Sequence, residues 1–442
     1  MGRIARTLAI VGLIIAGGLP LRAQRPASPA IQPGDTVVWL GDSITQQDLY
    51  TWYLETYWLT RFPTWPLRFR NAGWGGDTAW LRQRRDATHS LNEAQLFGSG
   101  GPLSEAAQEA LRRHLAFGLG RDVLALKPTV VTIDFGMNDA RGGDARLDAY
   151  AAGLRELIRQ LKSARVRVIV LSPSPEQRNQ PGEPGGSAYN RMLARYSDRA
   201  AEVAAAEGVP FIQQLQPFLE VLRRGTQAKP TFNLIPDAVH PGPAGQLVMA
   251  WAILKGMNAP ALVAEIAIDR DGGVAHATGA RVNDLSVQGL RVAFTARLAA
   301  LPWYLPPETR PVWELTRIYD ELDRFTIRIP GLGVGVWEVR VNGKPAGTVH
   351  AGELERGWNP LTVEASPLLE RSRQIHDLVR QKNQAYFRLW RTPLGNNPPA
   401  ADAWQAEAAQ LSQRIAELEQ QIDALRRQPI VFRFEFVPRR SS

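Results

Sequence analysis

Residues 37–45, Val-Val-Trp-Leu-Gly-Asp-Ser-Ile-Thr, decide how the rest of the chain can be interpreted. The four apolar residues 37–40 are typical of a buried strand in a parallel sheet, and Gly41 ends the strand where it leaves the sheet. Ser43 follows two residues later. Open α/β sheets bind ligands at the carboxyl ends of their strands, so Ser43 has the position of a nucleophile. The alternative is structural, because Asp and Ser before a helix also cap its free N–H groups.

The composition bounds the class of protein. A chain of 442 residues exceeds one ordinary domain, so we expect two or three folded units. The absence of cysteine excludes disulfides, a thiolate nucleophile and cysteine-bound metals. The net charge of +9 comes mainly from arginine, and the arginines are scattered without a basic run interleaved with aromatic residues. This pattern indicates a solvated surface and predicts no nucleic-acid partner.

The N-terminus has the organisation of a secretory signal peptide. Arginine residues precede an apolar run over residues 8–19, and Ala23 offers a small residue for cleavage. We predict a signal peptide over residues 1–23, a short disordered linker over residues 24–34, and an exported protein, periplasmic or secreted. The apolar run is shorter than the ~20 residues of a membrane-spanning helix, so no stable membrane insertion is expected after cleavage.

Between residues 35 and 260, strand-like and helix-like segments alternate. Apolar runs, or at 67–70 an alternation of apolar and charged residues, predict strands at 37–40, 67–70, 129–133, 166–171 and 210–212. Helical spacing of apolar residues predicts helices near 103–126, 147–161, 187–207 and 243–255. This alternation is typical of a three-layer α/β fold, in which a doubly wound parallel sheet carries helices on both faces.

Polar residues follow three of the predicted strands where each strand ends. Ser43 follows the first strand, and the glycine-rich turn at 71–78, Asn-Ala-Gly-Trp-Gly-Gly-Asp-Thr, follows the second. In that turn the backbone can approach a ligand closely, so the N–H of Gly76 is a candidate hydrogen-bond donor. After the third strand, Asn138 offers a side-chain amide that can donate to an oxyanion.

The last such segment of this domain is Asp237-Ala238-Val239-His240. An imidazole can take up a proton near neutral pH, and Asp237 can accept the other ring N–H of His240, which fixes the tautomer and the orientation of the ring. By itself this segment also suits the entry to a helix. The other histidines of the chain have no comparable neighbours.

Together, and in this order, four of these segments resemble the sequence blocks of the SGNH, or GDSL-type, hydrolase family. The matches, within about residues 35–258, are GDSIT at 41–45, NAGWGGDT at 71–78, GMND at 136–139 and DAVH at 237–240. The resemblance implies a flavodoxin-like α/β fold. It implies Ser43 as nucleophile, His240 as base and Asp237 as the carboxylate that orients the His240 ring. The oxyanion-hole donors would be the N–H groups of Ser43 and Gly76 and the amide of Asn138.

The chemistry implied is hydrolysis of a carboxylic ester by a serine nucleophile, with no metal or organic cofactor. We expect the substrate to be a small-molecule or polysaccharide ester, above all a short-acyl (acetyl) ester of a carbohydrate. Lysophospholipids, other lipids and thioesters are alternative substrates. An alternative of another class is a non-catalytic exported binding or scaffold protein, but the sequence retains both nucleophile and base, which argues against a vestigial site.

From about residue 266 the apolar pattern changes to period two. This predicts a small antiparallel, β-sandwich-like domain over residues 266–365 and 429–438. Residues 366–428 predict two helices, and the second helix carries a heptad seam between Trp404 and Leu425. We expect the helices to form an antiparallel hairpin inserted into the β-domain, whose last strand rejoins its sheet. The alternative is a homo-oligomer that forms a coiled coil through the second helix.

Overall fold

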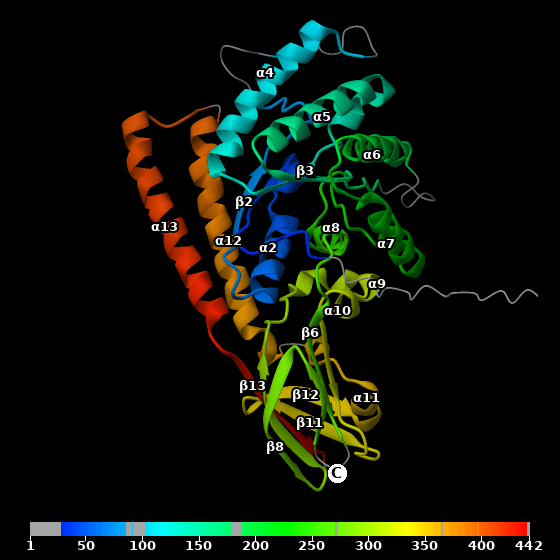
Figure 1. Ribbon diagram of the computed structural model, residues 1–442. Coiled ribbons are helices and arrows are strands. Elements are labelled where there is room, and N and C mark those ends of the chain that lie inside the picture. The colour runs from blue at the N-terminus through cyan, green and yellow to red at the C-terminus, as the bar shows by residue number, and fades with distance from the viewer. Residues whose placement is uncertain are drawn as a thin grey trace, which may run out of the picture.

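The computed structural model describes residues 28–84, 91, 102–178, 187–269, 273–363, 366–395 and 397–439. The predicted signal peptide lies outside these residues. Within them, the chain forms a doubly wound α/β domain, two further sheets and a long helical hairpin (Figure 1). No helix in the part of the chain so described has the length and apolar character needed to cross a membrane.

The first domain is built on a five-stranded sheet in the order β2-β1-β3-β4-β5. Its strands are β1 (Thr36–Gly41), β2 (Arg68–Gly73), β3 (Val130–Asp134), β4 (Arg167–Leu171) and β5 (Phe211–Ile212). All neighbouring strands pair in parallel. In β1 the five residues 37–41 are buried, because helices cover both faces of the sheet. The predicted doubly wound parallel sheet is confirmed.

Helices cover the sheet in two layers. They are α1 (Ser43–Gln46), α2 (Leu49–Arg61), α4 (Glu105–Asp122), α5 (Leu147–Ser163), α6 (Ala188–Ala206), α7 (Leu215–Ala228) and α8 (Pro243–Gly256), with the 3₁₀ helices η1 (Leu124–Leu126) and η2 (Asp139–Arg146). Helices α4, α5 and α6 pack side by side on one face, and α2 and α8 pack on the other with α7 beside α8 (Figure 1). In α5, Leu154, Leu157, Ile158 and Leu161 are buried at helical spacing, which is why the sequence pattern located this helix.

The segment before β1 differs from the disordered linker expected from the sequence. The backbone N–H of Ala30 donates to the carbonyl oxygen of Met257 at 2.9 Å, and Nη1 of Arg167 donates to the carbonyl oxygen of Ala30 at 2.8 Å. Ile31 is fully buried in the core. The amino-acid composition did not indicate this packing. A single apolar side chain, that of Ile31, holds the segment against the domain within a run that is otherwise rich in Pro, Ala and Ser.

The second part of the chain contains two further sheets. One has the order β10-β6-β7, and the other has the order β12-β11-β13-β9-β8. Their strands are β6 (Leu262–Ile268), β7 (Val274–Thr278), β8 (Ala280–Gln288), β9 (Arg291–Leu298), β10 (Arg324–Arg328), β11 (Val336–Val341), β12 (Lys344–His350) and β13 (Ile430–Pro438). The larger sheet is antiparallel throughout, as predicted. Between β11 and β12, Asn342 and Gly343 both have positive φ (51° and 76°), which suits a type I′ hairpin turn.

The three-stranded sheet corrects the prediction of a purely antiparallel domain, because β10 pairs with β6 in parallel. Parallel neighbours need a long crossover, and β7 to β9 with several short helices supply it. Those helices are η3 (Pro307–Val312), α9 (Trp313–Thr316) and α10 (Ile318–Glu321). Three more, α11 (Ala351–Arg356), η4 (Pro360–Thr362) and η5 (Pro367–Leu369), lie between β12 and the helical hairpin.

Helices α12 (Glu370–Arg391) and α13 (Ala401–Arg427) form the antiparallel hairpin, with η6 (Thr392–Leu394) after α12 (Figure 1). In the heptad seam, Ile415, Leu418 and Ile422 are buried, and α13 packs on α12 of the same chain. Strand β13 then pairs with β9 and β11, so the hairpin is an insertion in the larger C-terminal sheet. Figure 1 shows α12 between α13 and α2, and α12 also contacts the edge strand β2.

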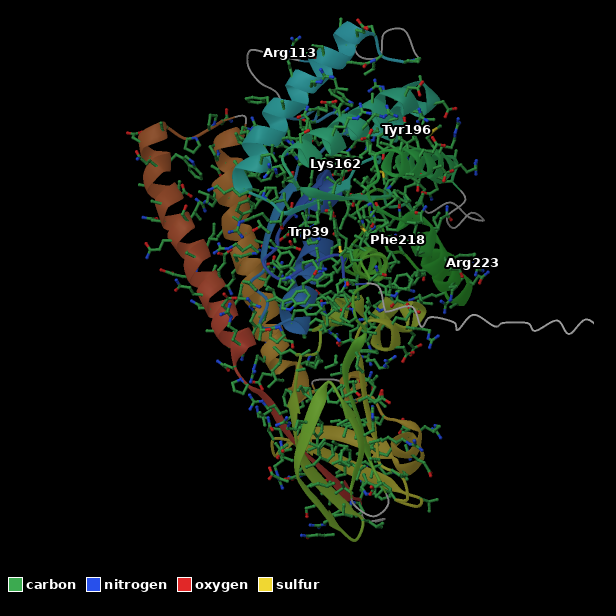
Figure 2. The ribbon with its side chains drawn as sticks, in the orientation of Figure 1. Trp39, Arg113, Lys162, Tyr196, Phe218 and Arg223 are labelled. Carbon is green, nitrogen blue, oxygen red and sulfur yellow. The ribbon has the colours of Figure 1, made fainter. Side chains whose placement is uncertain are left out.

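One apolar core runs through the described chain. Trp39 and Phe218 are buried inside the first domain, whereas the side chains of Arg113 and Arg223 extend into solvent (Figure 2). The same apolar cluster continues through the larger C-terminal sheet, where Phe434 is fully buried, and into both helices of the hairpin. The two parts of the chain therefore share a core.

Candidate active site

Ser43 is the first residue of α1, just beyond the carboxyl end of β1. The cap of this short helix is Asp42, whose Oδ1 accepts a hydrogen bond from the N–H of Ile44 at 2.9 Å. The hydroxyl of Ser43 is therefore not used as the helix cap. Gly41 has no room for a side chain, since a Cβ there would lie 2.1 Å from Oγ1 of Thr45. The tight turn that presents Ser43 depends on this glycine.

The His240 ring lies between Ser43 and Asp237, although 197 positions separate it from Ser43 in the sequence. Its Nε2 is 2.8 Å from Oγ of Ser43, and its Nδ1 is 2.7 Å from Oδ2 of Asp237. With the proton on Nδ1 donated to the carboxylate, Nε2 is free to accept a proton from the hydroxyl. The side chain of His240 is 30% exposed, so a substrate can reach it from solvent.

The carboxylate of Asp237 is held by the backbone of its own turn. Its Oδ1 accepts hydrogen bonds from the N–H groups of Val239 at 3.0 Å and His240 at 2.7 Å. Burial acts to raise its pKa, but these bonds and the one to the His240 ring outweigh burial and lower the pKa of Asp237 to about 2. Ala238 has a left-handed backbone (φ 72°), which costs about 1–2 kcal/mol for a residue with a Cβ. The N–H of Gln177 donates to the carbonyl oxygen of Ala238 at 3.1 Å and holds this residue in place.

The glycine-rich turn after β2 lies beside α1. The N–H of Gly75 donates to Oε1 of Gln46 at 2.7 Å, and a Cβ on Gly75 would lie 3.9 Å from Cβ of Ser43. Gly76 has a left-handed backbone (φ 74°), and its carbonyl oxygen accepts a hydrogen bond from Nη2 of Arg82 at 2.6 Å. These contacts keep the backbone of the turn next to the nucleophile candidate.

Asn138 connects the first two segments of the site. Its Nδ2 donates to the carbonyl oxygen of Asp77 at 3.0 Å and, over a longer distance of 3.3 Å, to Oδ2 of Asp42. Asp42 precedes Ser43, and Asp77 follows Gly76, so the amide lies between these two segments. The structure thus brings every candidate site residue found in the sequence to one edge of the parallel sheet.

Buried carboxyl groups lie under this edge. Burial raises the pKa of Asp134 to about 7, against hydrogen bonds from Gln214 and Tyr50 that lower it. Burial raises the pKa of Asp139 to about 7, and it raises the pKa of Asp42 well above its usual range, where the charge of Asp134 adds to the effect. These shifts reduce the negative charge near the place where an oxyanion would form.

Sequence reasoning missed residues that support the site from outside the four blocks. Oε1 of Gln177 accepts from the N–H of Leu234 at 2.8 Å, which braces the turn that carries His240. Oε1 of Gln246 accepts from the N–H of Tyr50 at 2.9 Å and joins α8 to α2. A single glutamine in the apolar sequence of α8 is a detectable signal, whereas Gln177 lies in a polar loop where nothing distinguishes it.

The described residues hold no group of three or more His, Cys, Asp or Glu side chains arranged to bind a metal ion. The site offers a hydroxyl, an imidazole, a carboxylate and amide donors. Side chains of these kinds perform nucleophilic and general acid–base catalysis of acyl transfer.

The parallel sheet order β2-β1-β3-β4-β5, with a serine, a histidine and an aspartate at its carboxyl edge, defines a hydrolase of the SGNH type. The comparison with family models agrees. Residues 39–248 match the model of the GDSL-like lipase/acylhydrolase family. Residues 39–248 therefore form a domain of this family, and this domain is a carboxylic ester hydrolase.

Solved structures resemble the chain to different extents. BT4096, described as a gut microbial diltiazem-metabolizing enzyme, is 20% identical with a TM-score of 0.75, and the match covers 94% of this chain and 100% of that one. Axe2, an acetylxylan esterase from Geobacillus stearothermophilus, is 24% identical with a TM-score of 0.38, and the match covers 52% of this chain and 96% of that one. No significant match was found among curated proteins. The first likeness shows a fold shared with another protein over 94% of this chain.

Proposed function

We propose that this chain is an exported serine esterase that removes short acyl groups, above all acetyl, from carbohydrates. The observation that carries the proposal is the pair of hydrogen bonds that connects Oγ of Ser43 to the ring of His240, at 2.8 Å, and that ring to Asp237, at 2.7 Å. Such a pair of hydrogen bonds activates a serine hydroxyl, which is a weak nucleophile at neutral pH without a neighbouring base.

In the proposed reaction, Oγ of Ser43 attacks the ester carbonyl carbon while Nε2 of His240 takes the hydroxyl proton. Asp237 accepts the hydrogen bond from Nδ1 and stabilises the imidazolium that forms. His240 then donates its proton to the oxygen of the leaving alcohol as the bond between that oxygen and the acyl carbon breaks. A water molecule, deprotonated by the same ring, attacks the acyl-enzyme and releases the acid.

The carbonyl oxygen becomes negatively charged at each attack, and we assign its stabilisation to the N–H groups of Ser43 and Gly76 and to the amide of Asn138. The contact of 3.3 Å between the Asn138 amide and Asp42 is long for a hydrogen bond, so the amide gives up little when it donates to a substrate oxygen instead. Loss of one such donor typically lowers kcat ~10²–10³-fold.

The solvent exposure of His240 and Asp237 supports a carbohydrate as the alcohol part of the ester. The side chain of Asp237 is 58% exposed and that of His240 is 30% exposed, so the side of the site from which the alcohol leaves faces solvent. A bulky hydrophilic alcohol fits such an open site. A long acyl chain instead requires an apolar channel that encloses most of its surface.

Release of acetate from an acetylated oligosaccharide, measured for wild type and Ser43→Ala, tests the proposal. We expect turnover by the wild type and a fall of at least about 10³-fold in the variant, because it lacks the nucleophile. Lysophospholipid offered in parallel should be a poor substrate. Ser197→Ala, which changes a buried serine on α6, is the matched control and should keep wild-type activity. Equal rates for wild type and Ser43→Ala on every ester would contradict the proposal and favour a binding or scaffold protein.

Export is the second part of the proposal, and it is supported by the apolar run over residues 8–19 behind arginine residues. The N-terminal residue of the mature protein tests it. We expect N-terminal sequencing of periplasmic or secreted material to find a chain that begins near Gln24. Protein that keeps Met1 and stays in the cytosol would contradict export.

Self-association through a coiled coil formed by α13 remains a prediction.

A further inference from the structure

Helix α12 belongs to the C-terminal hairpin in sequence, yet it lies against the first domain (Figure 1) and contacts two segments of the active site. The first contact starts at Asn383, whose Nδ2 donates to Oδ1 of Asp48 at 3.3 Å. The same oxygen accepts from Nδ2 of Asn71 at 3.2 Å, and that Nδ2 also donates to the carbonyl oxygen of Thr45 at 2.6 Å. Thr45 lies in α1, two residues after Ser43. This path therefore connects α12 to the helix that carries the nucleophile.

The second contact starts at Trp390, near the carboxyl end of α12, and leads to the turn after β2. Nε1 of Trp390 donates to Oδ1 of Asp122 at 3.3 Å. Oδ2 of Asp122 accepts from Nη1 of Arg84 at 3.1 Å, and Nε of Arg84 donates to Oδ2 of Asp77 at 2.9 Å. The side chains of Arg84 and both aspartates are fully buried. Asp77 is the residue whose carbonyl oxygen accepts the amide of Asn138, so this path ends at the oxyanion-hole donors.

Aromatic contacts reinforce the second path. The rings of Trp390 and Trp74 pack edge to face with their centroids 5.9 Å apart, and Cζ of Arg391 lies 3.5 Å from the centroid of Trp74. Trp74 is followed by Gly75, on which a Cβ would lie 3.9 Å from Cβ of Ser43. The end of α12 therefore holds the glycine-rich turn where that turn lies against the nucleophile.

We propose that α12 is a part of the active site, in which Asn383 and Trp390 are positioning residues that hold the nucleophile helix and the oxyanion-hole turn in place. The inference rests on the proposed function, because it takes the nucleophile and the oxyanion donors to be those named there. It implies that the hydrolase domain at residues 39–248 is not catalytically complete without the C-terminal hairpin.

Small displacements of these groups have large kinetic effects. A misplacement of about 1 Å can lower a rate about 10²-fold, and an oxyanion donor acts only at hydrogen-bond distance from the developing charge. The ring of Trp390 packs against Trp74, and the side chains around Arg84 are fully buried, so a shift of this ring displaces the glycine-rich turn. Because the affected groups act in the transition state, kcat should fall much more than KM rises.

The test compares kcat, KM and melting temperature for point variants of the full chain, with p-nitrophenyl acetate as substrate. We expect Trp390→Ala and Asn383→Ala to lower kcat about 10- to 100-fold and to change KM less than about threefold. Trp390→Phe loses the N–H and part of the ring system but keeps an aromatic ring against Trp74, so it should recover much of the lost kcat. This recovery would identify ring packing as the main positioning contact of Trp390.

Two controls separate positioning from a general loss of stability. Val379→Ala leaves a cavity at a fully buried position of α12 outside both paths, and Phe387→Ala changes a residue of the same helix that is 38% exposed. Both should keep wild-type kcat, although Val379→Ala lowers the melting temperature.

Wild-type kcat in both Trp390→Ala and Asn383→Ala would overturn the inference. It would also be overturned if Val379→Ala, with a melting temperature equal to that of these two variants, lost as much kcat as they do. If Trp390→Ala does not fold, Asn383→Ala decides the question, and a wild-type kcat in that variant would overturn the inference. A wild type no faster than Ser43→Ala would instead overturn the proposed function, and the inference with it.

Discussion

At the scale of single residues, Asp237 is the most exposed member of the hydrogen-bonded series that begins at Ser43, with 58% of its side chain open to solvent. Water screens the charge of such a group, so we attribute its effect chiefly to orientation of the His240 ring. We expect Asp237→Asn to lower kcat about 10²–10⁴-fold, because an amide at this position favours the wrong tautomer of the ring. Steady-state kinetics on p-nitrophenyl acetate check this, and a cooperative thermal transition shows that the variant is folded.

The pKa of Asp237, which its hydrogen bonds lower to about 2, sets the pH dependence of this effect. A carboxylate with a lowered pKa stabilises the folded state above its unfolded pKa of about 3.9, and that stability is lost as the pH falls through about 2. From about pH 5 to pH 9, Asp237 is ionised, so its own titration does not change kcat in that range. The wild type should lose stability relative to Asp237→Asn as the pH falls from about 4 to about 2, and melting temperatures whose difference stays constant over that range would contradict the low pKa.

The candidate site residues could be predicted from the sequence because Ser43, Gly76 and Asn138 follow the ends of strands and Asp237 lies three residues before His240. The sequence left one question open at Ser43, since either Asp42 or Ser43 could cap α1, and only the folded backbone decides it. Two supports of the site could not be predicted. Gln177 and Trp390 contact segments far away in the chain through hydrogen bonds and ring packing, and no local pattern marks such partners.

At the scale of secondary-structure elements, prediction succeeded where burial dictates the pattern. β1 contains a continuous apolar run, all five residues of β3 are buried, and α5 has a buried stripe at helical spacing. β2 is different, because it continues to Gly73, beyond the predicted end at residue 70. Asn71 and Gly73 pair with Trp39 and Gly41 through the backbone, and backbone pairing does not require apolar side chains.

Two other element-level features were missed for different reasons. In α7, Leu215, Phe218 and Leu222 are buried at helical spacing, but Pro217 in the first turn makes the segment resemble a loop. Proline is tolerated there because the first N–H groups of a helix have no partner within it. The parallel pairing of β6 with β10 joins strands far apart in the chain, so neither strand's own periodicity contains it.

At the scale of the whole molecule, the helical hairpin packs against the first domain, although the sequence pattern assigns the two to separate units. Helix α12 packs on α2 and covers the edge strand β2, which protects that edge from pairing with another chain. Nε1 of Trp52 donates to the carbonyl oxygen of His376 at 2.7 Å, and the two rings stack 3.7 Å apart. Burial lowers the pKa of His376 to about 3, so its ring is neutral inside this contact at physiological pH. We therefore expect the first domain and the hairpin to unfold together.

A buried ion pair between Lys382 on α12 and Glu55 on α2 makes this expectation testable, since their side chains are only 2% and 4% exposed. Lys382→Met leaves Glu55 without its cation in a place where burial already raises the pKa of that carboxyl. The free energy of unfolding should fall by about 3–5 kcal/mol, with one transition retained. Urea unfolding measures this as a lower midpoint at an unchanged m-value. Adding Glu55→Leu, which replaces the second charge by an apolar group, should restore most of the loss, because no uncompensated charge is then buried. Separate unfolding transitions for the hairpin and the first domain of the wild type would contradict the shared core. If Glu55→Leu does not restore the stability of Lys382→Met, Lys382 acts through contacts other than its charge.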